Sequence, residues 1–141
     1  MSDWVVDTNV LVKWVLPEMD SALALQVAAD TAAAGGTLFA LDLAMIEASN
    51  VIWTKLHRKV VTLPEARQAL TLLQNVSVQT ASALPLLAKS FEVAAQFDIA
   101  VYDALFVVSV RERGIGGVTA DEPLVRAVSA AYPEIKLLRN W

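Results

Sequence analysis

Short apolar runs alternate along the chain with longer segments whose apolar residues recur at helical spacing. The short runs predict buried strands at residues 4–6, 37–40, 76–78, 116–119 and 135–138. The longer segments predict helices at residues 9–16, 21–34, 44–58, 63–74, 84–97, 102–113 and 122–131. This alternation favours an α/β fold, with helices on both faces of a parallel sheet of four to five strands. No linker or repeat divides the chain, so we expect one domain over residues 1–141.

Proline, glycine and capping residues mark several of the predicted helix ends. Pro17 stops the first helix, and Gly35 with Gly36 ends the second. Thr62 is placed to cap the fourth helix, with Glu65 three residues on as in a capping box. These signals agree with the boundaries that the apolar pattern predicts.

The composition excludes several kinds of functional site but says less about the fold. Hydrophobic residues make up 56% of the chain and charged residues 18%, so an apolar self-association face is expected. There is no cysteine and one histidine, His57, which excludes disulfides, thiolate sites and a multi-histidine zinc site within one chain. Residues 1–7 do not resemble a signal peptide and no apolar run approaches ~20 residues, so we expect a cytoplasmic protein without a membrane span.

The net charge of −4 argues against nucleic-acid binding by the usual rule. Four carboxylates change that interpretation. Asp7 and Asp121 follow predicted strands, while Glu47 and Asp103 lie near the starts of predicted helices. Because ligands of parallel sheets bind outside the carboxyl ends of the strands, these four groups are placed to converge. Each of them alone is equally typical of a turn, a helix cap or a solvated helix position.

Convergence of these carboxylates would have an energetic cost. Two unit charges ~4 Å apart repel by about 4 kcal/mol at an effective dielectric of 20. A hard divalent cation such as Mg²⁺ or Mn²⁺ relieves that repulsion, and it can activate water for phosphodiester hydrolysis. The four acids therefore indicate a metal-dependent hydrolase as one interpretation.

Four motifs in this order resemble one known family. They are Val5-Val6-Asp7-Thr8-Asn9, Glu47-Ala48-Ser49-Asn50, Tyr102-Asp103-Ala104-Leu105 and Thr119-Ala120-Asp121-Glu122. Together they resemble PIN domains, and specifically the VapC-type toxin ribonucleases of bacterial toxin–antitoxin pairs. The resemblance implies a three-layer α/β/α fold and an endoribonuclease that uses Mg²⁺ or Mn²⁺. It also implies a VapB-like antitoxin partner, a homodimer and a toxin–antitoxin hetero-oligomer.

The same resemblance implies roles for individual residues. Asp7, Glu47 and Asp103 would be metal-site carboxylates, with Asp121 as the fourth. The positions expected to support them are Thr8, Asn9, Asn50 and Thr119. Ala100 departs from the family pattern, which commonly has Ser or Thr there to cap the helix of Asp103; Asp98 is an alternative cap in a shifted frame.

Basic and aromatic residues offer contacts for RNA or for a protein partner. The candidates for phosphate contact are Lys13, Lys55, Arg58 and Lys59, although a solvated helix end explains the basic cluster as well. His57 lies about 15 Å along the helix from Glu47, which disfavours it as a base. For Trp14 and Trp53 we expect packing in the core or in an interface rather than stacking on RNA bases. The apolar helices 21–34 and 63–73 are candidates for antitoxin or dimer contacts.

Two other classes of protein remain open at this point. A non-catalytic binding domain of the same fold is one alternative. A phospho-acceptor protein is the other. A phosphoryl-transfer enzyme with Asp7 as its nucleophile usually has a second acid where Asn9 stands. A receiver-type signalling domain pairs its acidic pocket with a lysine at a strand end, and neither the fourth nor the fifth predicted strand ends in one.

Overall fold

A computed structural model describes residues 2–141 and contains one five-stranded sheet. The strands pair in the order β3-β2-β1-β4-β5, and every pairing is parallel. Their bounds are β1 (Trp4–Val6), β2 (Leu38–Leu41), β3 (Gln79–Ala81), β4 (Gly116–Thr119) and β5 (Ile135–Leu137). The predicted α/β class with a parallel sheet is confirmed.

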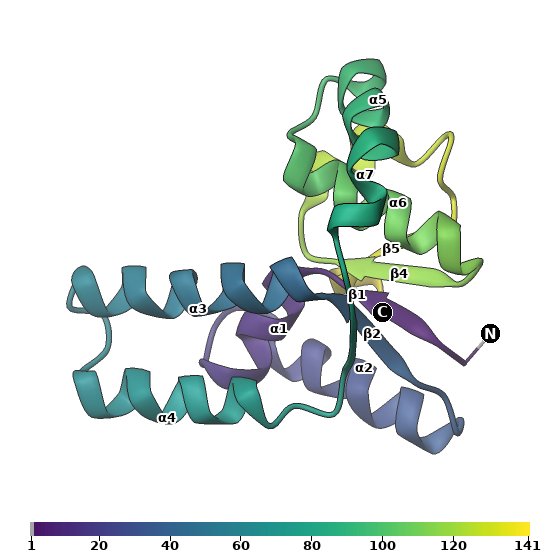
Figure 1. Cartoon of the computed structure of the whole chain (residues 1–141). Coiled ribbons are helices and arrows are strands. Elements are labelled where there is room, and N and C mark those ends of the chain that lie inside the picture. Colours follow the sequence, from purple (N-terminus) through teal and green to yellow (C-terminus); the bar gives the residue numbers. More distant parts are fainter. Residues whose placement is uncertain (1) are drawn as a thin grey trace.

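Helices cover both faces of this sheet, as Figure 1 shows. Helices α1 (Thr8–Val15), α2 (Ser21–Ala33), α3 (Asp42–His57) and α4 (Leu63–Gln74) gather on one side, with α3 and α4 extending together as a pair. Helices α5 (Leu87–Phe97), α6 (Val101–Arg113) and α7 (Glu122–Val128) lie on the other. Two short 3-10 turns, Leu84–Leu86 and Leu138–Asn140, complete the elements.

The central strand β1 divides two hydrophobic cores, because successive side chains of a strand point to opposite faces. Val6 packs into the core formed with α1 to α4. Val5 packs into the core formed with α6, α7 and β5. Both side chains are 1% exposed, so three layers follow directly from the two-residue period of the strand.

The register of β1 and β4 places the ends of these strands side by side. Val6 is paired with Val118, and the amide of Asp7 donates to the carbonyl of Val118 at 3.0 Å. Asp7 and Thr119, the residues that come next, are therefore neighbours at the carboxyl edge of the sheet. This is the edge where open parallel sheets bind ligands.

Several predicted boundaries need correction. The third strand lies at Gln79–Ala81 and not at residues 76–78, since Val76 and Val78 pack against the core in the connection from α4, and pairing with β2 begins only at Gln79. Helix α3 begins directly after β2, at Asp42. The turn at Leu84–Leu86 is 3-10, and α7 already ends at Val128. The capping box of Thr62 and Glu65 is present as predicted.

Within residues 2–141 no single helix is long and apolar enough to cross a bilayer. The bent segment from Leu84 to Arg113 meets that test only as a pair of helices joined at 113°.

Gly117→Ala is expected to destabilise the protein by about 1–3 kcal/mol through overpacking. An added Cβ would lie 2.4 Å from Cγ2 of Val110, which is buried on α6 and rigid at its branched carbon. Urea unfolding measures the loss, with the exposed Ser77→Ala as a control expected within about 0.5 kcal/mol of wild type. Equal midpoints for Gly117→Ala and wild type would contradict the close packing of α6 on β4.

Candidate functional site

Asp7 lies where β1 ends and caps helix α1. Its Oδ1 accepts the amide of Thr8 at 2.8 Å. Its Oδ2 accepts the hydroxyl of Thr119 at 2.8 Å and the side-chain amide of Asn9 at 3.3 Å. Three donors, two from the start of α1 and one from the end of β4, thus fix the carboxylate in one orientation.

Thr119 and Asn9 connect Asp7 to the segment that carries Asp121. Thr119 is 0% exposed, and its hydroxyl accepts from Asn9 Nδ2 and from the amide of Asp121, both at 3.1 Å. Asn9 Oδ1 accepts the amide of Ala120 at 2.8 Å. The ends of β1 and β4 are therefore held together by side chains as well as by the sheet, and Asn9 and Thr119 both contact the Asp7 carboxylate.

Glu47 reaches the same region from α3. Its Oε1 accepts the hydroxyl of Thr8 at 3.2 Å, so Thr8 contacts Asp7 through its amide and Glu47 through its side chain. Four residues separate Glu47 from Val51 on the helix, which places both side chains on one face. Thr8 is thus the link between the carboxylates of β1 and α3.

Asp103 lies in the first turn of α6. Ala100 caps this helix without a side-chain hydrogen bond, as its departure from the family pattern predicts. The alternative cap is not seen, because Asp98 ends α5 in the left-handed conformation, with φ of 54°. Presentation of Asp103 therefore depends on how α6 packs against β1 and β4.

Asp121 caps α7, accepting the amide of Leu124 at 3.0 Å. It does not line the pocket that the other three acids share, but its charge lies close enough to Asp103 to raise the pKa of that carboxyl. Asp121 thus flanks the acidic group.

The three other acids line one pocket of about 270 Å³. Its walls come from the end of β1, from α1, α3 and α6, and from the loop between α1 and α2. The lining residues are Asp7, Thr8, Asn9, Val12, Glu18, Glu47, Val51, Tyr102 and Asp103. Sequence reasoning missed Glu18 and Tyr102. Tyr102 directly precedes Asp103, but nothing in the sequence connects the loop residue Glu18 to the pocket.

Burial makes the ionised acids of this pocket unfavourable. It raises the pKa of Asp7 to about 6, against the hydrogen bonds from Thr119 and Thr8 and with smaller contributions from the charges of Asp103 and Glu47. Burial also raises the pKa of Glu47, with Asp103 adding to it, and raises the pKa of Asp103, with Asp121 adding to it. Desolvation raises these pKa values more than the repulsion between the acids does, although the sequence analysis considered repulsion alone. Both effects act in the same direction.

The carboxylate oxygens of this pocket fit a hard divalent cation that keeps part of its water shell. Mg²⁺ prefers oxygen ligands and is usually held by one or two carboxylates plus waters. Among residues 2–141, no three acidic or histidine side chains approach closely enough to enclose one ion. The fit is therefore to an open, hydrated ion and not to a closed cage of carboxylates.

None of the remaining predicted residues lines this pocket, and their contacts differ. Asn50 is exposed, and within the described chain its contact is through its carbonyl, which accepts from Thr54. Lys13 and Lys55 both pair with Glu18. Arg58 and Lys59 are exposed beyond the end of α3 and form no salt bridge with the described residues. Roles for these residues in RNA contact or support stay predictions.

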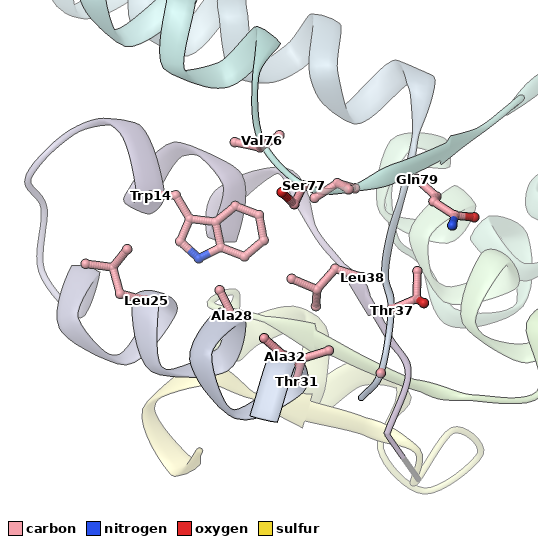
Figure 2. A pocket seen from close by; sticks show the side chains of 12 residues that line it. Trp14, Leu25, Ala28, Thr31, Ala32, Thr37, Leu38, Val76, Ser77 and Gln79 are labelled. Atoms are coloured by element: carbon pink, nitrogen blue, oxygen red, sulfur yellow. The ribbon is translucent and has the colours of Figure 1, made fainter. Parts of the chain in front are cut away.

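The aromatic residues differ in their surroundings: Trp53 is 55% exposed, whereas Trp14 packs against the core as expected. His57 stacks on Trp53, with ring centroids 4.9 Å apart, at the far end of α3. Trp14 packs against the core, and its indole donates to the carbonyl of Ala24 at 2.6 Å. Trp14 also lines a larger cavity, of about 610 Å³, which lies between α2 and the connection from α4 to β3 (Figure 2). Apolar side chains and small residues dominate this cavity, and it contains none of the four acids.

Comparison with known proteins identifies the family. The model of the PIN domain matches residues 4–129, and the chain belongs to this family. Two crystal structures show the same fold, each with a TM-score of 0.66. PAE2754 from Pyrobaculum aerophilum is 19% identical, over 99% of this chain and 93% of that one. The sarcin–ricin loop cleaving toxin VapC20 of Mycobacterium tuberculosis is 17% identical, over 94% of this chain and 98% of that one. No curated protein sequence gives a significant match.

Replacing Asp7 tests the cost of its buried charge. Because the folded pKa of about 6 exceeds the ordinary 3.8, this group contributes stability below about pH 4 that is lost as pH rises through 6. An asparagine side chain cannot ionise, so Asp7→Asn should gain up to about 3 kcal/mol relative to wild type between pH 4 and 7.5. Thermal or urea unfolding at several pH values measures this, with the exposed Asp98→Asn as reference. A stability difference that stays constant with pH would contradict the raised pKa.

Proposed function

We propose that this PIN domain, residues 1–141, is a metal-dependent endoribonuclease that hydrolyses RNA phosphodiesters. One observation carries the proposal: Asp7, Glu47 and Asp103 come from three separate elements and line one pocket. The pKa values of all three are raised, so the arrangement is unfavourable for an empty pocket at neutral pH. A cluster that costs stability is more typical of a functional site than of a structural one.

The acids and the residues hydrogen-bonded to them have distinct roles in this proposal. Bound Mg²⁺ or Mn²⁺ would polarise the phosphodiester and supply an activated water. Asp7, Glu47 and Asp103 would hold the ion, with Asp121 beside them. Thr119 and Asn9 orient the Asp7 carboxylate, and Thr8 orients Glu47. One carboxylate would act as the general base for a water molecule, whose oxygen forms a bond to phosphorus while the bond to the 3′-oxygen breaks. The family resemblance implies this course, which leaves 5′-phosphate and 3′-hydroxyl ends.

The proposal extends to a toxin of the VapBC type acting in the cytoplasm. Its support is the sequence resemblance and the shared fold of VapC20, which is itself a toxin. A VapB-like antitoxin would then bind this chain, which would also form a homodimer and a toxin–antitoxin hetero-oligomer. Leu25 on α2 and Leu63, Leu70 and Leu72 on α4 are each at least 40% exposed, which suits these helices to such contacts.

Two alternatives are less well supported. In a phospho-acceptor domain a lysine would face the acidic pocket, but Lys136, on β5, lies 4.6 Å from the ring of Trp141 and lines a different cavity. A non-catalytic binding domain has no use for buried carboxylates of raised pKa.

RNA cleavage tests the proposal directly. Wild-type protein with Mn²⁺ or Mg²⁺ should cut RNA to 5′-phosphate ends, and EDTA should stop it. Asp7→Asn should lower the rate at least about a hundredfold, as expected when a group that stabilises charge in the transition state is lost. Asp98→Asn removes an acid outside the pocket and should cut within about twofold of wild type. End mapping on a mixed RNA pool gives the readout, and equal cleavage by Asp7→Asn and wild type would refute the assignment.

Metal binding should be measurable without any substrate. At pH 7.5, Mn²⁺ at 100 times its dissociation constant should stabilise the wild type by about 2.7 kcal/mol, because the ion binds only the folded protein. Chelation should reverse the gain. Asp7→Asn should lose most of it, while Asp98→Asn should keep it. Thermal unfolding is the measurement, and a Mn²⁺ response of the same size in Asp7→Asn would mean that the ion binds elsewhere.

A further inference from the structure

The acidic pocket continues toward a second group of charges between α1 and α3. Lys13 follows Asn9 by four residues on α1, and Lys55 follows Val51 by four residues on α3. Asn9 and Val51 line the pocket, so the four-residue spacing places both lysines one helical turn further along the facing surfaces of the two helices. Glu18 lines the same pocket from the loop between α1 and α2.

One carboxylate joins the two lysines. Glu18 Oε1 lies 3.5 Å from Nζ of Lys13, and Oε2 lies 3.1 Å from Nζ of Lys55. The side chains are only partly open to solvent, at 14% for Lys13, 22% for Glu18 and 28% for Lys55. Neither lysine forms another salt bridge with residues 2–141. Two ammonium groups thus converge on a single pair of oxygens.

The backbone of Glu18 is fixed, whereas its side chain extends from a loop. The Glu18 amide donates to Ser21 Oγ at 2.9 Å, and that hydroxyl donates to the carbonyl of Leu16 at 3.2 Å. The amide of Ser21 donates back to the Glu18 carbonyl at 3.2 Å. A rotation of the Glu18 side chain would therefore release both lysines without moving α1, α3 or the loop.

We infer that Lys13 and Lys55 form a binding site for a backbone phosphate of single-stranded RNA, and that the Glu18 carboxylate occupies this site until RNA displaces it. The inference rests on the proposed ribonuclease function. Two anionic oxygens already sit between the lysines, and a phosphate presents the same kind of acceptor with more charge. The site lies one helical turn beyond pocket-lining residues, so it contacts RNA beside the bond to be cut. Glu18 lowers the charge of the site from +2 to +1 while RNA is absent.

Equilibrium binding of a fluorescent single-stranded RNA tests this site. All variants carry Asp7→Asn so that the probe stays intact. Glu18→Gln keeps the size of the side chain but removes its charge, and should bind RNA about two- to fivefold more tightly, since a partly exposed ion pair no longer has to break. Lys13→Met and Lys55→Met keep the apolar stem, and each should weaken binding and lower the slope of log K against log salt by about 0.7. Lys55→Arg should keep the wild-type slope.

Lys89 and Glu112 provide the matched control, because they form a lysine–glutamate pair on α5 and α6 outside the pocket. Glu112→Gln and Lys89→Met should leave RNA affinity and its salt slope unchanged. Circular dichroism of each variant checks that it is folded. Equal affinities for Glu18→Gln and Glu112→Gln, or unchanged salt slopes in both lysine variants, would overturn the inference.

Cleavage by the protein without Asp7→Asn separates the two proposals. If RNA binding depends on Lys13 and Lys55 but nothing is cut with Mn²⁺, the phosphate site stands and the ribonuclease function fails. If RNA is cut but substitutions of Glu18, Lys13 and Lys55 leave RNA affinity unchanged, the ribonuclease function is supported and the phosphate site is refuted.

Discussion

The structure around the pocket depends on the burial of one carboxylate, that of Asp7, where β1 meets α1 and β4. A buried charge is tolerated only when its oxygens are well hydrogen-bonded. Thr8 and Asn9, in the first turn of α1, and Thr119, at the end of β4, supply those bonds. The wholly buried Thr119 also holds the amide of Asp121. The same hydrogen bonds thus hold the Asp7 carboxylate in place and join the ends of β1 and β4.

That arrangement is incomplete in a specific way. The hydrogen bonds lower the pKa of Asp7, but burial raises it more, so the carboxyl still has a pKa of about 6. Burial also raises the pKa of Glu47, more than the hydrogen bond from Thr8 lowers it, and raises the pKa of Asp103. The charge of Asp103 opposes ionisation of Glu47, and both charges oppose ionisation of Asp7. Separate elements deliver the three acids, so none can be withdrawn without disturbing β1, α3 or α6. Protonation or a bound cation would each remove this cost, and only a cation would leave the carboxylates ionised.

Features of the fold and of the site that depend only on neighbouring residues could be predicted from the sequence. Asp7 ends a short apolar run, and Thr62 with Glu65 forms a capping box, so both could be placed from neighbouring residues alone. β3 was misplaced because Val76 and Val78 alternate like a strand while they pack as a connection. Glu18 could not be found, since its importance comes from Lys13 and Lys55 on two helices that only the fold brings together. Long-range charge pairing has no period along the chain.

A net charge of −4 does not decide whether the protein meets RNA, because charges act over about 8 Å at physiological salt. Within that range the local charge differs between the acidic pocket and the lysine pair one helical turn beyond it. Asp7, Glu47 and Asp103 make one end negative, while Lys13 and Lys55 make the other end positive apart from Glu18. Negative charge suits an ion at the first end, and positive charge suits a phosphate at the second. For the proposed RNA binding, the overall negative charge is therefore no obstacle, because the lysine pair presents positive charge locally, and Glu18 partly neutralises it while RNA is absent.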